Sequence, residues 1–116
     1  MARVTSILIY PDSDAPGQTL SVSYVSEQGL DGDRRKKSPV HLVAVEDYID
    51  LHPRANLIVD VSADVLHGLV SRRLRVGTVE LEVTALAGDC AGVYAVVPEP
   101  GDVSVGDELL VGEPTG

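Results

Sequence analysis

Cys90 is the only cysteine in the sequence and the strongest candidate for a reactive side chain. A thiolate can accept a sulfane sulfur as a persulfide and release it again, provided that its pKa is low and the thiol is accessible. Its neighbours Gly88, Ala91 and Gly92 are small and leave room for a ligand. Asp89 works against the thiolate, because a like charge disfavours the charged form. The alternative is a small buried hydrophobic side chain, the commonest fate of a free cysteine, and both interpretations stay open.

A second candidate site is the segment 29–34, Gly-Leu-Asp-Gly-Asp-Arg, which runs directly into a short basic stretch at residues 35–37. Successive backbone N–H groups in such a loop can form an anion-binding nest. Arg34 is suited to hold a phosphate through two parallel hydrogen bonds. We therefore expect a small anion to be bound by Gly29, Gly32, Asp33, Arg34, Arg35 and Lys36. The alternative is a β-turn whose glycines serve geometry and whose basic side chains are solvated.

The histidines do not form a recognisable metal-binding pattern. His41, His52 and His67 lie 11 and 15 residues apart, unlike the close spacing of zinc ligands, so no metal site is predicted. His41 falls in an expected strand, and we interpret it as a hydrogen-bonded core or edge residue. The sequence also lacks a Ser-His-Asp motif, a Walker loop and a Rossmann fingerprint.

The residues that must position these sites form one domain, residues 1–116, with a core from about residue 3 to 111 and a flexible tail at 112–116. Hydrophobic residues make up 44% of the chain, without Trp or Phe, so the core must be aliphatic. Expected strands cover residues 3–10, 20–25, 40–45, 57–61, 74–76, 79–85, 93–97, 103–105 and 109–111. Short helices are expected at 46–51 and 63–69, the second capped by Ser62.

Many short strands with few helices indicate an all-β fold, a small antiparallel β-barrel that is closed or nearly closed. The segments 74–76 and 79–85 flank Gly77-Thr78 and are expected to pair as a hairpin. In the segment 20–25, Leu20, Val22 and Tyr24 alternate with Ser21, Ser23 and Val25, which predicts a strand with one buried face.

The charge balance excludes several classes of partner. The formal net charge is −9, which repels nucleic acid and anionic membranes unless a basic patch intervenes. The basic run at residues 34–37 is too short for nucleic-acid binding and lacks interleaved aromatic residues. No apolar run is long enough for a membrane span, and the N-terminus lacks the pattern of a signal peptide. These features predict a soluble, cytoplasmic protein.

Beyond these patterns, segment 29–34 resembles the Gly-x-x-Gly-Asp-Arg signature of MOSC domains, the module named after the C-terminal part of molybdenum-cofactor sulfurases. Further segments resemble the family in the same order, namely residues 39–43, 56–57, 74–77, 81–84, 90, 92–95, 100–101 and 105–107. The order and rough spacing hold over about residues 3–111. One departure is that Cys90 and Gly92 are nearly adjacent here, whereas longer members carry an insertion between them, so the chain resembles a minimal member of the family.

The resemblance implies molybdopterin or the molybdenum cofactor as ligand, without a direct metal ligand from the chain. It implies Cys90 as the catalytic persulfide carrier and the loop from Gly29 to Lys36 as the cofactor-binding segment. A cysteine desulfurase or a molybdoenzyme would then act as partner in trans. We further expect Cys90 to lie near Arg34 and the basic run, because its thiolate needs a positive neighbour. The alternative function is a non-catalytic accessory domain that binds a protein or small molecule, with Cys90 structural.

Overall fold

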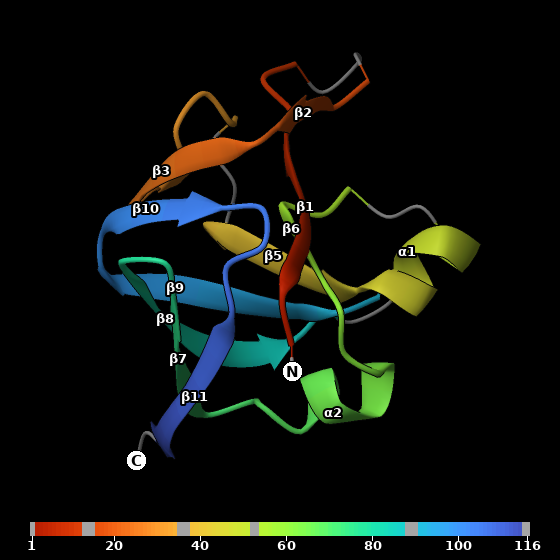
Figure 1. Ribbon diagram of the computed structural model, residues 1–116, viewed down its shortest axis with the longest axis vertical. Helices are drawn as coiled ribbons and strands as arrows, with labels where there is room; N and C mark the ends of the chain where they lie inside the picture. The colour runs from red at the N-terminus through yellow and green to blue at the C-terminus, as the bar shows by residue number, and fades with distance from the viewer. Residues whose placement is uncertain (1, 13–15, 35–37, 52–53, 88–90, 115–116) are drawn as a thin grey trace.

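The computed structural model describes residues 2–12, 16–34, 38–51, 54–87 and 91–114. Strands dominate, and two short helices lie to one side of them (Figure 1). The elements in chain order are β1 (Val4–Ile9), β2 (Gln18–Leu20), β3 (Val22–Ser26), β4 (Gly29–Leu30), β5 (Val40–Ala44), α1 (Val45–Leu51), β6 (Leu57–Val59), α2 (Ala63–His67), β7 (Arg72–Val76), β8 (Val79–Leu86), β9 (Val93–Glu99), β10 (Gly101–Ser104) and β11 (Leu109–Pro114).

The strands form two hydrogen-bonded sheets. One has the order β11-β7-β8-β9-β5-β6-β1-β2, and the other has the order β10-β3-β4. The pair β5–β6 is parallel because α1 carries the chain back between them, and the other pairs are antiparallel. An isolated bridge joins Arg3 to Glu108, between the start of β1 and the entry to β11. Over the described residues, the sheets do not close into a barrel. The predicted mostly β class is confirmed, whereas the small antiparallel barrel is not.

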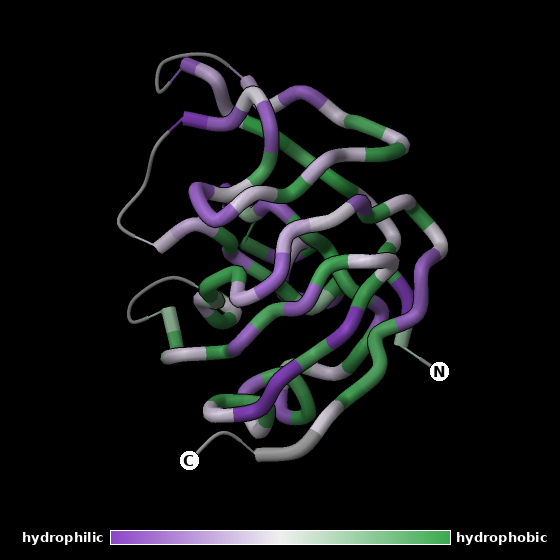
Figure 2. Tube along the Cα trace, turned by 90° about the vertical axis from the view of Figure 1, so that its left-hand side faces the viewer, coloured by the Kyte–Doolittle hydropathy of each residue, from purple (hydrophilic) through white to green (hydrophobic). Residues whose placement is uncertain are grey.

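The aliphatic residues of the strands build the main core, as their alternation predicts (Figure 2). The predicted hairpin is confirmed: β7 pairs with β8, and buried Leu74 lies opposite buried Leu81. A second, smaller cluster lies on the other side of the sheet from that core and contains Leu8, Tyr10, Val43, Ala55 and Ile58. We call it the outer cluster; Tyr48 of α1 and Ala91 pack against it.

The segment 20–25 differs from its apparent pattern. It is split into β2 and β3 by a bend at Ser21, and β3 buries Ser23 and Val25 while Val22 and Tyr24 are about half exposed. The physical reason is pairing on both sides, because Val25 lies opposite Leu30 of β4 and Ser23 lies opposite Val103 of β10. The buried face of β3 therefore follows these neighbours rather than the more apolar alternating set.

Both predicted helices are present in slightly different bounds. Ser62 caps α2 as expected, since its Oγ accepts a hydrogen bond from the N–H of Val65 at 3.2 Å. Two segments are more regular than expected: the expected loop at 29–34 contains β4, and β11 continues to Pro114 into the expected tail. None of the helices in the described residues is long and apolar enough to cross a membrane.

Candidate functional site

The glycine-containing loop at residues 29–34 is attached to Tyr10, at the end of β1. The backbone N–H of Tyr10 donates to Asp33 Oδ1 at 2.7 Å, and the N–H of Arg34 donates to the Tyr10 carbonyl at 3.3 Å. Gly29 is required here for two reasons. Its φ is +113°, and a Cβ would lie 2.5 Å from the carbonyl oxygen of Pro39. The loop is therefore held in one conformation by β1 and by the segment that precedes β5.

Three backbone N–H groups of this loop point into the fold rather than toward a ligand. Each donates to a carbonyl oxygen: Asp31 to Tyr24 at 2.8 Å, Asp33 to Leu30 at 3.0 Å and Arg34 to Tyr10 at 3.3 Å. A nest made of these three donors would have to break bonds that the protein already makes. Anion binding at this loop would therefore depend on side chains, with Arg34 exposed and suited to the task.

Asn56, which is buried, and Asp33, which is half-buried, form the base of the loop. Asn56 is fully buried, and its Nδ2 donates to Asp33 Oδ2 at 3.0 Å and to the Leu8 carbonyl at 3.2 Å. Its Oδ1 accepts from the N–H of His41 at 3.1 Å. Both carboxylate oxygens of Asp33 thus accept hydrogen bonds from within the fold. These bonds fix the backbone next to Arg34. They also offset part of the negative charge of Asp33, which would otherwise repel an anion at this loop.

His41 extends the hydrogen-bond network to Ala91, in the turn that leads into β9. It is 6% exposed, and its Nε2 lies 2.6 Å from the carbonyl oxygen of Ala91. Because a carbonyl oxygen only accepts, Nε2 carries the proton. The ring also lies against Tyr94, with centroids 5.0 Å apart. The interpretation of His41 as a hydrogen-bonded core residue is confirmed.

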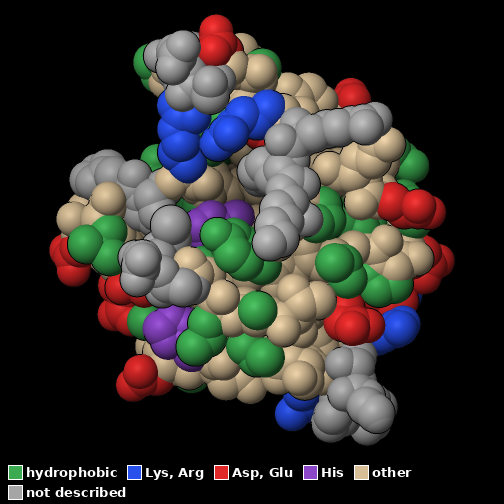
Figure 3. Space-filling model, turned by 180° about the vertical axis from the view of Figure 1, so that it is seen from behind, with side chains coloured by type: hydrophobic (Ala, Val, Ile, Leu, Met, Phe, Trp, Pro, Cys, Tyr) green, Lys and Arg blue, Asp and Glu red, His purple; other side chains and the backbone are tan. Residues whose placement is uncertain are grey.

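Arg54 supplies a second positive charge beside Tyr10. Its guanidinium carbon lies 4.9 Å from the centroid of the Tyr10 ring, a cation–π geometry, and its side chain is exposed. Burial raises the pKa of Tyr10 above its usual value, the neighbouring Tyr48 adds to the rise, and Arg54 opposes it. Figure 3 shows basic side chains side by side on one face, next to a histidine. Arg34, through its backbone N–H, and Arg54, through its guanidinium group, thus both contact Tyr10 from two separate segments.

Three residues of the predicted site, Cys90, Arg35 and Lys36, lie outside the described residues. The expected approach of Cys90 to the basic run lies there too. The residues on either side of Cys90 are described at Ala87 and from Ala91 onward, where the N–H of Ala87 donates to the Gly92 carbonyl at 3.0 Å. Ala91 packs on the outer cluster that contains Tyr10. The outer cluster thus contacts both segments: Ala91 packs on it, and the 29–34 loop is hydrogen-bonded to its member Tyr10.

Gly92 fixes the backbone at the end of that turn. Its φ is +90°, and a Cβ would overlap the carbonyl oxygen of Leu42 in β5. Only glycine tolerates both the dihedral and this close approach. The geometry of the Ala91 carbonyl, which His41 binds, therefore depends on Gly92.

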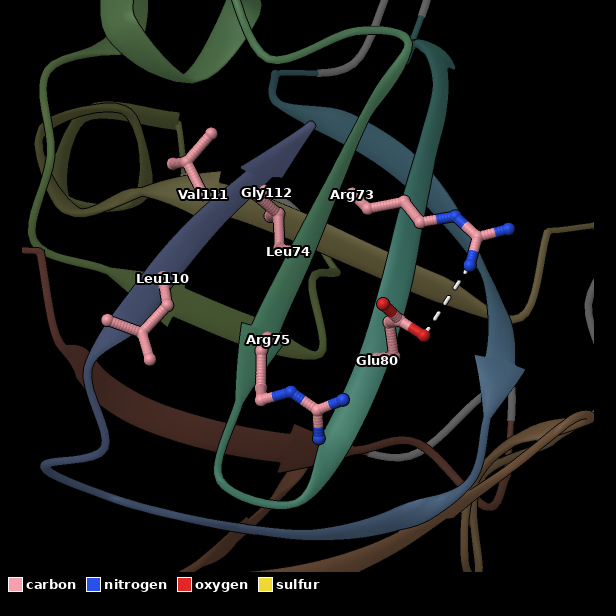
Figure 4. A pocket seen from close by; sticks show the side chains of 7 residues that line it. All are labelled: Arg73, Leu74, Arg75, Glu80, Leu110, Val111 and Gly112. Carbon is pink, nitrogen blue, oxygen red and sulfur yellow. Dashed lines mark hydrogen bonds and ion pairs between the residues drawn. The ribbon is translucent and has the colours of Figure 1, made fainter. Parts of the chain in front are cut away.

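A surface pocket of about 250 Å³ lies elsewhere, on strands β7, β8 and β11 (Figure 4). Leu110 and Val111 line one side, and Arg73 pairs with Glu80 at 3.5 Å on the other. None of the predicted site residues lines it. Its arginines face carboxylates of the same sheet, since Arg75 also pairs with Glu99 at 3.7 Å, so it is a poor anion site.

Sequence reasoning missed Tyr10 and Arg54 entirely. Asn56 was noticed as a motif position and not as the centre of a hydrogen-bond network. The available signal was its type: a lone asparagine before a run of apolar residues must find partners when buried. Within the described ranges, no group of three or more His, Cys, Asp or Glu side chains is arranged to hold a metal ion.

Comparison with known proteins gives similarity of fold. No family model and no curated protein matches this sequence. Among solved structures, the YuaD protein from Bacillus subtilis has a TM-score of 0.75 at 14% identity, over 95% of this chain and 94% of that one. YiiM from Geobacillus stearothermophilus has a TM-score of 0.69 at 14% identity, over 97% of this chain and 76% of that one. YiiM from Escherichia coli has a TM-score of 0.69 at 13% identity, over 98% and 71%. The chain shares the fold of these proteins, which supports the MOSC-like fold that the motifs predict.

Proposed function

We propose that this protein binds a small phosphate-bearing ligand, by resemblance a molybdopterin, between Arg34 and Arg54. The observation that carries the proposal is that both arginines are exposed and are attached to the same tyrosine, one through its backbone and one over its ring. Two guanidinium groups suit a phosphate because each can donate two parallel hydrogen bonds.

The residues suit a phosphate better than a metal. In the described part of this loop, Asp33 already accepts hydrogen bonds inside the fold through both carboxylate oxygens, and Asp31 is a single exposed carboxylate close in sequence to the cationic Arg34. A bound pterin would supply the phosphate that the two arginines neutralise. In this proposal Asp33 does not contact the ligand. Its hydrogen bonds to Tyr10 and Asn56 fix the backbone that carries Arg34, and Gly29 and Gly32 supply the positive φ angles of the loop.

Cys90 is the sulfur carrier in the same proposal. Its thiolate would attack the outer sulfur of a persulfide on a separate desulfurase, forming a new S–S bond at Cys90 while the donor cysteine leaves as a thiolate. No net oxidation or reduction occurs, because a sulfane sulfur is passed from one thiol to another. This part of the proposal is supported by the resemblance and by the packing of Ala91, the next residue, on the outer cluster that contains Tyr10.

The test is a titration of the full chain with inorganic phosphate, followed by arginine Nε–H and backbone amide signals. We expect the signals of Arg34 and Arg54 to shift with a common midpoint, and Arg34→Ala to weaken binding at least about tenfold. Arg75→Ala is the matched control, because it removes one positive charge from a distant strand and should leave binding unchanged. Absence of any response at both arginines would refute the proposal.

A second candidate function is a non-catalytic accessory domain. The observation that favours it is the outward face of β3, where Val22 is 54% and Tyr24 is 50% exposed. A half-exposed tyrosine beside an aliphatic residue is typical of a protein-binding surface. The two functions separate at Cys90: a thiol that alkylates only after denaturation favours the accessory domain, and one that reacts in the native state favours the carrier.

A further inference from the structure

A continuous series of hydrogen bonds connects the 29–34 loop with the turn before β9. It begins where Tyr10 donates to Asp33, passes from Asp33 to Asn56 at 3.0 Å and from Asn56 to the backbone of His41 at 3.1 Å. It ends where His41 Nε2 donates to the Ala91 carbonyl at 2.6 Å. The side chains of Asp33, Asn56 and His41 thus join five segments that are separated in the sequence.

We propose that Asp33, Asn56 and His41 couple the anion site to this turn. An anion bound at Arg34 then changes the hydrogen bond that His41 donates to Ala91, and a change at Ala91 alters anion affinity. For its ligand the inference rests on the proposed function above. It goes further by assigning regulation: occupancy of the anion site sets the geometry of the turn that follows Cys90 in sequence.

The physical basis is that two of the three linking side chains, Asn56 and His41, are shielded from water, while Asp33 is partly buried. Asn56 is 0% and His41 is 6% exposed, so little water can replace a lost bond. Buried polar networks polarise and restrain each other, and losing one member disturbs the others. At the far end, the backbone next to Ala91 is held by the hydrogen bond from the Ala87 N–H to the Gly92 carbonyl at 3.0 Å, and a Cβ at Gly92 would overlap the Leu42 carbonyl. Any coupling must also be reciprocal between the two ends.

The first experiment needs no ligand. Amide hydrogen exchange of the full chain is compared for wild type, His41→Phe and His41→Gln. The Phe variant keeps a ring beside Tyr94 and removes the Nε2 donor, whereas the Gln variant retains a donor. We expect exchange of the Tyr10 and Arg34 amides to rise at least about fivefold in His41→Phe, relative to the β7–β8 hairpin, and to recover in His41→Gln.

The matched control is His67→Phe, because His67 is exposed on α2 and should leave those amides unchanged. Unchanged Tyr10 and Arg34 amides in His41→Phe would overturn the coupling, whatever phosphate does. If the Phe variant does not fold, the Gln variant and wild type still decide through the second experiment.

In the second experiment inorganic phosphate is titrated while the Ala91 amide and the His41 ring nitrogens are followed. In wild type and His41→Gln, the Ala91 signal should shift with the same midpoint as Arg34. In His41→Phe, the Arg34 response should persist while the Ala91 response is lost. A response at Arg34 without one at Ala91 in wild type overturns the coupling alone. No response at Arg34 overturns the proposed function, and the exchange experiment then decides the coupling.

Discussion

Replacing Asn56 by alanine is the sharpest test of how the candidate site is held together. The side chain is fully buried and makes at least three hydrogen bonds with described residues, two as donor and one as acceptor. Alanine fits without a clash but leaves a small cavity, so the loss combines the polar contacts with a packing contribution. Removing the amide takes a donor from the Asp33 carboxylate and an acceptor from the His41 N–H.

The magnitude follows from these bonds. A hydrogen bond to a charged group contributes about 1.5–3 kcal/mol, and a buried donor that loses its acceptor costs about 1–3 kcal/mol. Because the two effects share one network, we expect a total loss of roughly 3–5 kcal/mol. Small domains have a free energy of unfolding of about 5–15 kcal/mol, so the variant should still fold, with a much lower stability.

The assay is urea unfolding at neutral pH, followed by circular dichroism. With an m-value of about 1.5 kcal/mol per molar, the midpoint should fall by roughly 2–3 M. Gln18→Ala is the control, because Gln18 is an exposed amide on the edge strand β2 and should change stability by less than about 0.5 kcal/mol. A loss below about 1 kcal/mol for Asn56→Ala would show that the network does not hold the site.

Four further predictions follow from other contacts. Gly92→Ala should destabilise clearly more than Gly106→Ala in urea unfolding, because both have a positive φ but only Gly92 meets a neighbouring carbonyl; equal losses would contradict the steric argument. Ser62→Ala should cost about 1 kcal/mol by loss of the α2 cap, with exposed Ser21→Ala as control, and no loss would mean the cap is not needed. Since the pKa of Tyr10 is raised, folding favours its neutral form; stability should therefore fall as pH rises above about 10, and Tyr10→Phe should lessen that fall between pH 9 and 11. Asn56→Asp should lower the free energy of unfolding, relative to wild type, more at pH 7 than at pH 4, because its carboxylate would face that of Asp33. A pH-independent difference would argue against that contact.

Local signals predicted the elements of this fold well. The alternation around Gly77 predicts the β7–β8 hairpin, and Ser62 followed by Asp64 predicts α2, because both depend on residues close in sequence. The barrel expectation failed for a long-range reason. Strand number and spacing do not say which strand edges meet, and within the described residues one isolated bridge, between Arg3 and Glu108, lies where closure would begin.

The site was predictable in part. The motif at 29–34 indicated the loop, and its basic end indicated an anion. The direction of the backbone N–H groups could not be predicted from the sequence, because it depends on the carbonyl groups of Tyr24 and Tyr10, which lie far from the loop in the chain. Likewise the buried face of β3 is set by Leu30 and Val103, which lie on its partners, so the apolar pattern of β3 alone pointed the wrong way.

The contact between residues 2–4 and 106–109 affects how the chain can fold while it is being synthesised. The N–H of Val4 donates to Asp107, and the N–H of Leu109 donates to Ala2. At about 5–20 residues per second, a ribosome needs roughly 5–20 s between making the first partner and the second. During that interval the start of β1 has only β2 and then β6 to pair with. The pairing at the start of β1 must therefore wait for the segment beyond β10, and until then the nascent chain exposes one edge at the first residues of β1, while Ile7–Ile9 can already pair with β2.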